Sequence, residues 1–159
     1  MNEKTNSLDG YFALQVRRFQ QLMEEVLQCC ETRAAHLSKK FGLPDAELRC
    51  LMLFREDKYL TVKGLAQKMD VAKSRVTKIV SGLLAKDLVA RIEDPTDGRI
   101  RLIHLTAKGR ATCEEIAGFI GTLHEMILQE LSPEERTAVL TALERLRTSM
   151  ETVKERVFS

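Results

Sequence analysis

The feature of the sequence that most constrains its fold is a pair of short strand-like runs that follow directly after a helical pattern. Apolar and polar residues alternate over residues 88–93 and 100–105, which is typical of β-strands. The short segment between the runs contains Pro95 and Gly98, residues that favour a tight turn. The pattern therefore predicts a β-hairpin.

Two short helices are expected directly before this hairpin. Thr61 is a good N-cap for a helix that ends near Met69, and Asp70 interrupts the helical pattern. A second helix then begins near Ala72. Two helices joined by a short turn and followed at once by a two-stranded hairpin make a winged helix-turn-helix, so the sequence predicts this architecture.

The second of these helices has two chemically different faces. On a helix that turns about 100° per residue, the apolar side chains of residues 71–84 gather on one side of the wheel. Arg and Lys can donate to guanine O6 and N7 in the major groove, and Ser and Thr can reach bases or phosphates. An ordinary solvated face is the alternative, and the adjoining hairpin favours DNA binding. The predicted DNA-binding residues on the polar face are Lys73, Ser74, Arg75, Thr77 and Lys78.

Positive charge is concentrated in the same region of the chain. Residues 61–110 contain eleven Lys or Arg and five Asp or Glu, a net charge of +6, whereas the remaining residues carry −4 and the whole chain +2. A basic region within an otherwise acidic chain suggests a polyanionic partner.

The expected tip of the hairpin adds two candidate DNA-binding residues. An Arg at the tip of a wing is attracted by the negative potential of a narrow, A·T-rich minor groove, and Arg99 is placed for that contact. Asp97 either orients the guanidinium of Arg99 or shapes the turn.

Long helical patterns flank the predicted winged helix. Apolar residues recur every three or four positions from Phe12 to Phe41, and Gly42 and Pro44 end the pattern. This helix is longer than a core of this size requires, so it could reach a second chain. The C-terminal helix starts at a strong signal, Ser132-Pro133-Glu134-Glu135, and carries a heptad-like seam suited to packing against another helix. The fold class predicted is mainly α, an α+β winged helix between long helices.

The stretch from Leu60 to Gly109 contains a set of characteristic residues: Leu65-Ala66, Val76 to Lys78, Leu83, Lys86-Asp87-Leu88-Val89, Asp94-Pro95, Asp97-x-Arg99, Leu105-Thr106 and Gly109. With these residues the stretch resembles the winged-helix core of the MarR family of bacterial transcription regulators. The resemblance implies a homodimer with intertwined terminal helices that binds a palindromic promoter site, usually as a repressor released by a small molecule or by oxidation. It implies a single MarR-like domain over residues 1–159, a DNA-binding core at 44–106, and dimerisation helices at 8–42 and 107–157.

The sequence departs from this family's pattern at three positions. Ala72 stands where a capping Ser is common, Asp87 replaces the commoner Gly after the second helix, and Gly98 occupies a tip position that is often basic. The first change weakens the helix N-cap, and the third removes a possible wing contact. The preferred bases and the operator sequence stay open.

In the family, effectors are often aromatic acids or phenols bound between the dimer helices and the winged helix. Phe12, Phe19, Phe41 and Phe54 could line such a pocket, but packing in the core is favoured. A phosphate-cradling Gly loop, a nucleophile elbow and paired His ligands are all missing from the sequence, so we expect no enzyme, cofactor or metal site.

The longest apolar run has five residues and the start lacks a signal-peptide pattern, so we expect a cytoplasmic protein. Reduced, buried thiols are then the default for Cys29, Cys30, Cys50 and Cys113. Two alternatives stay open: a regulator that senses oxidants through one of these thiols, and a winged helix that binds a protein instead of DNA.

We predict that Arg99→Ala weakens A·T preference at the flanks of the DNA site more than base preference at its centre, because the wing is expected to read the flanks. Footprinting of both proteins on one duplex measures this effect. Equal protection of the flanks by the variant would show that Arg99 does not enter the minor groove.

Overall fold

The computed structural model describes residues 3–93 and 101–158 of the chain. It confirms the predicted fold class, a mainly helical protein with one two-stranded antiparallel sheet. The chain divides into two compact units, Met1–Cys113 and Glu114–Ser159, and each is described by itself. In chain order the elements are α1 (Glu3–Phe41), α2 (Asp45–Leu53), α3 (Val62–Met69), α4 (Lys73–Ala85), β1 (Val89–Glu93), β2 (Arg101–Leu105), α5 (Ala107–Gln129) and α6 (Pro133–Phe158).

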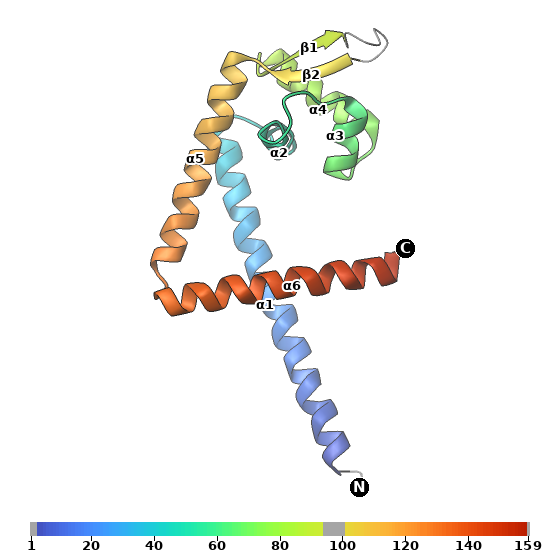
Figure 1. The fold of residues 1–159 in the computed structure, drawn as a ribbon, viewed down its shortest axis with the longest axis vertical. Helices are drawn as coiled ribbons and strands as arrows, with labels where there is room; N and C mark the ends of the chain where they lie inside the picture. Colours follow the sequence, from blue (N-terminus) through green and yellow to red (C-terminus); the bar gives the residue numbers. More distant parts are fainter. Residues whose placement is uncertain (1–2, 94–100, 159) are drawn as a thin grey trace. The chain divides into compact units, whose positions relative to one another are not determined.

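The core of the first unit forms where α2, α3 and α4 pack against one another beside the β1–β2 hairpin (Figure 1). One face of α4 is central to this core, since Val76, Val80 and Leu83 are completely buried. Burial of each such side chain contributes about 1.5–3 kcal/mol relative to exposure. The orientation of α4 therefore follows from its apolar face.

The turn between α3 and α4 is built by local hydrogen bonds. Thr61 caps α3, because its hydroxyl oxygen accepts from the Gly64 amide at 3.0 Å. At the other end Asp70 has a φ of 54°, and the Val71 amide donates to the Ala66 carbonyl at 3.1 Å, which closes the helix in a Schellman arrangement. The predicted helix-turn-helix is confirmed.

A second left-handed residue, Asp87, ends α4 in the same way. Its φ is 58°, and the Leu88 amide donates to the Leu83 carbonyl at 3.0 Å. Glycine reaches this conformation without strain, which explains why glycine is common here in the family that the sequence resembles. Aspartate tolerates the conformation better than most side chains, so the departure leaves the turn intact.

The hairpin is paired from Val89↔Leu105 to Glu93↔Arg101, within one residue of the strands expected from the sequence. A residue before α3 extends this sheet: the Leu60 amide donates to the Ile103 carbonyl at 3.0 Å, and the Ile103 amide donates back at 2.8 Å. β2 therefore lies between β1 and Leu60. This bridge ties the base of the wing to the helix-turn-helix.

The start of α5 is joined to the turn after α4. Thr106 caps α5 by accepting from the Gly109 amide at 2.9 Å, and its hydroxyl donates to the Asp87 carbonyl at 2.7 Å. A Cβ at Gly109 would overlap the carbonyl oxygen of Leu88. Glycine is therefore required at position 109, because the backbone of the preceding turn occupies the space of a side chain.

The long helices carry apolar side chains that the chain itself leaves exposed. Phe12 and Phe19 of α1 are 65% and 46% exposed, so the expectation that they pack in the core is wrong within the single chain, whereas Phe54 is buried as expected. The seam of α6 is also exposed, for example at Leu143 and Val153.

The capping box predicted at the start of α6 is present in the second unit. The Ser132 amide donates to the Glu135 carboxylate at 2.8 Å, and the Glu135 amide donates to the Ser132 hydroxyl at 3.2 Å. Hydrogen bonding of the Glu135 carboxyl to the backbone amide and side chain of Ser132 lowers the pKa of that carboxyl.

We predict that Gly109→Ala destabilises the protein by about 1–3 kcal/mol or more, because the added methyl overlaps a backbone carbonyl that cannot move freely. Urea unfolding at fixed protein concentration measures the change. The matched control is Gly64→Ala in α3, where an added Cβ meets only ordinary contacts and helix propensity improves. Equal stability of the two variants would show that the Gly109 contact is not needed.

Candidate nucleic-acid interface

The five residues predicted on α4 to bind DNA share one exposed face. Lys73, Ser74, Arg75, Thr77 and Lys78 are all exposed, whereas Val76 and Val80 between and beyond them are buried. Within residues 3–93 and 101–158, none of the three cations forms an ion pair. The structure thus places these cations together on a surface where they can meet an external anion.

Two hydroxyls of this face make hydrogen bonds along the helix. The Thr77 hydroxyl donates to the Lys73 carbonyl at 3.0 Å, and the Ser81 hydroxyl donates to the Thr77 carbonyl at 2.9 Å. Each hydroxyl oxygen keeps lone pairs that can accept a hydrogen bond. In this rotamer Thr77 is suited to accept from an amino group of cytosine or adenine.

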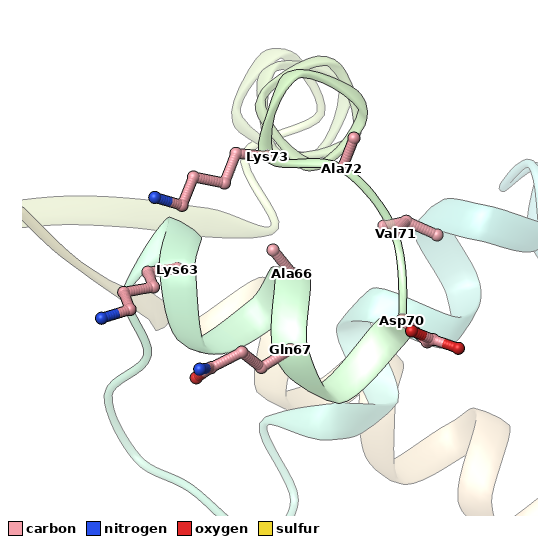
Figure 2. A pocket seen from close by; sticks show the side chains of 7 residues that line it. All are labelled: Lys63, Ala66, Gln67, Asp70, Val71, Ala72 and Lys73. Carbon is pink, nitrogen blue, oxygen red and sulfur yellow. The ribbon is translucent and has the colours of Figure 1, made fainter. Parts of the chain in front are cut away.

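A shallow hollow of about 500 Å³ lies at the turn between α3 and α4 (Figure 2). Lys63 and Gln67 line it from α3, and Lys73 lines it from α4. Figure 2 shows the polar ends of these three side chains on the same side of the hollow, with the Asp70 carboxylate on the opposite side. The arrangement offers two ammonium groups and one amide to a single anionic group.

The start of α4 adds a further favourable field at this hollow. Ala72 provides no side-chain cap, as expected from its departure from the family pattern. The first amides of α4 therefore face outward without a side-chain acceptor, and a helix N-terminus favours an anion. Together with Lys63 and Lys73, this end of α4 fits a backbone phosphate of DNA.

The sequence analysis did not identify Lys63 and Gln67. They lie four residues apart on α3 and so share one face of that helix, which is a readable signal. Their proximity to Lys73 depends on the angle between α3 and α4, and only the packed structure supplies that angle.

The wing residues Asp97 and Arg99 lie outside the described residues. On the described strands, Arg91 and Arg101 are exposed. Glu93 lies opposite Arg101 in the register of the two strands. Arg91 stands opposite the buried Ile103, so its side chain leaves the sheet on the face that also packs on the core.

The cysteines fall into two groups. Cys50 and Cys113 are buried as expected, but Cys29 and Cys30 are exposed on α1, so the expectation of burial is wrong for that pair. Burial, reinforced by the nearby Glu47 carboxylate, raises the pKa of the Cys50 thiol to about 12. Cys50 is therefore a neutral, unreactive thiol at physiological pH.

In the described part of the chain, His, Cys, Asp and Glu side chains form no group of three or more able to hold a metal ion.

An exposed cationic helix, set in a helix-turn-helix and flanked by a β wing, defines a winged helix-turn-helix protein of the DNA-binding class. Comparison with known proteins identifies the family. A sequence model of the MarR family matches residues 41–100. The transcriptional repressor MdtR of Bacillus subtilis (strain 168) is 28% identical over 134 residues, which cover 84% of this chain and 81% of MdtR. These matches support a winged-helix regulator of the MarR family that binds DNA.

Solved structures share this fold. A point mutant of the S. aureus protein MepR superposes with a TM-score of 0.75 at 19% identity, covering 83% of this chain and 98% of that one. Another MepR mutant, bound to an oligodeoxyribonucleotide, has a TM-score of 0.61 at 19% identity and covers 83% of this chain and 97% of that one.

None of the helices in the described part of the chain combines the length and apolar character that a bilayer span requires.

We predict that Cys50 and Cys113 do not react with a thiol reagent at pH 8 until the protein is unfolded, because both are buried and the pKa of Cys50 is about 12. Cys29, exposed on α1, should react in the native protein. Counting released chromophore before and after denaturation, with mass spectrometry to locate the label, measures this pattern. Rapid labelling of Cys50 in the folded protein would contradict its burial.

Proposed function

We propose that the protein is a homodimeric repressor that binds a palindromic promoter site, with α4 of each protomer in the major groove. The observation that carries the proposal is the exposed cationic face of α4, opposite a face buried in the core. A helix held in this way can enter the groove without any rearrangement of its own packing.

The residues of the interface divide into two roles. Arg75 and Lys78, on the exposed face, read bases by donating to guanine O6 and N7. Lys73, Ser74 and Lys63 surround the start of α4 and bind the phosphate backbone. Base contacts determine sequence preference, whereas phosphate contacts set register and add affinity for any duplex.

In this proposal the dimer is formed by the terminal helices. Residues 44–106 make the DNA-binding core, and residues 8–42 and 107–157 make the dimerisation helices. The exposed apolar side chains of α1 and α6, such as Phe12 and Leu143, support this assignment because a monomer would leave them in water. The two recognition helices of such a dimer should lie about 34 Å apart, one turn of DNA. Arg99 of each wing would then reach a flanking minor groove, while Asp97 either orients the guanidinium of Arg99 or shapes the turn.

The relatives support the same function. MdtR is named a transcriptional repressor, and MepR has been solved with a bound oligodeoxyribonucleotide. We propose that a small aromatic or phenolic effector releases the DNA, and thermal-shift screening with aromatic acids tests this step. In the thiol alternative the exposed Cys29 and Cys30 would be the sensors, and operator affinity would then fall after peroxide treatment.

We predict that Arg75→Ala and Lys78→Ala each weaken binding to a selected duplex by about 1–3 kcal/mol, the worth of one bidentate base contact. Lys63→Ala should instead weaken binding to all duplexes and reduce the slope of log K against log salt by about 0.9. Gel shifts across a salt series measure both effects.

The matched control is Lys154→Ala on α6, which removes the same charge outside the winged helix and should bind nearly as well as the unmodified protein. Unchanged affinity of the Arg75 and Lys78 variants would show that α4 does not read the bases. A protein that shifts no duplex at low salt would be a protein-binding winged helix instead.

A further inference from the structure

Glu47 is the one charged residue that is buried among residues 10–93 and 101–157, and it lies against the recognition helix. Its carboxylate oxygen Oε2 accepts from the Lys86 ammonium at 2.8 Å, a contact that joins α2 to the end of α4. A buried carboxylate is costly unless it is paired. The Lys86 ammonium supplies that partner.

The same carboxylate also lies directly against the side of α4. A Cβ at Gly82 would overlap Glu47 Oε1, so the glycine makes room for the carboxylate against the side of α4. One oxygen of Glu47 thus meets Lys86 and the other meets the backbone at Gly82. These two contacts lie one turn apart, at Gly82 and Lys86.

The dipoles of both helices favour this contact. Glu47 lies in the first turn of α2, where the helix dipole stabilises an anion. Lys86 caps the C-terminal end of α4, where a cation is favoured. The pair therefore joins the positive end of α2 to the negative end of α4.

The end of α4 is also held from its other side. The Lys108 ammonium of α5 donates to the Lys86 carbonyl at 2.8 Å. Lys86 thus contacts Glu47 of α2 through its side-chain ammonium and Lys108 of α5 through its backbone carbonyl. Both contacts connect the last turn of α4 to neighbouring helices.

We propose that Glu47 is a positioning residue for DNA reading, which holds α4 through Lys86 and Gly82 in the orientation that directs Arg75 and Lys78 to base edges. The inference rests on the proposed DNA-binding function. It goes beyond that function because Glu47 itself does not touch DNA. Base contacts depend on the orientation of α4, whereas attraction to phosphates depends mainly on charge.

The test uses the full chain and two duplexes, one selected by the protein from a random pool and one of shuffled sequence. Glu47→Gln keeps the size of the side chain and removes its charge. The preference ratio is the dissociation constant for the shuffled duplex divided by that for the selected duplex. This ratio should fall by about tenfold or more, the discrimination expected from one base contact. Affinity for the shuffled duplex should stay within about twofold, because the cationic surface remains.

Two further comparisons separate positioning from a general loss of stability. Asp57→Asn removes another ion pair of the same unit, with Lys68 at 3.0 Å, and should keep the ratio. Gly82→Ala leaves every charge in place but displaces the Glu47 carboxylate, so it should lower the ratio. In a Glu47→Ala background the added methyl meets no carboxylate, and Gly82→Ala should then cause no further loss.

Hydrogen exchange of the free protein gives a readout that does not need DNA. The amides of Lys86 and Leu88, which close the end of α4, should exchange faster in Glu47→Gln, and those of α3 should not. Unchanged exchange together with an unchanged ratio, in a folded variant, would overturn the proposal. If the unmodified protein binds neither duplex, the proposed function fails and the role in reading fails with it, whereas hydrogen exchange still reports whether Glu47 holds α4.

Discussion

Every DNA contact proposed for α4 depends on the burial of the opposite face of that helix. Val76, Val80 and Leu83 are completely buried, so the helix cannot rotate without exposing them to water. The opposite face, with Arg75 and Lys78, is consequently fixed toward solvent. The hydrophobic core therefore determines which side chains a duplex meets, although no core residue touches it.

The second constraint is the junction after α4, where several motifs of the family meet. The Asp87 turn is about twenty residues from the Thr106 cap and Gly109 in the sequence, yet together they form one set of contacts. Glu47 and Lys108 add contacts to the same turn through Lys86. This convergence explains why a glycine is needed on α5, outside the helix-turn-helix itself.

Much of the fold was predictable from short-range signals. The Thr61 cap, the Ser132 capping box and the alternation in the hairpin are local, and each is present as expected. Lys63 and Glu47 were not identified, because their roles depend on partners across the packed helices. The expected burial of Phe12 was wrong because periodicity shows that a helix has an apolar face but does not show what covers it.

The sequence by itself determined the order of the elements, the two faces of α4 and the concentration of positive charge around it, since these follow from residue spacing and composition. Only the tertiary structure decided that Lys63 lies beside Lys73, and that Glu47 is buried against Gly82. The physical reason is that such contacts depend on the distances and angles at which helices pack, and these are set by the whole core.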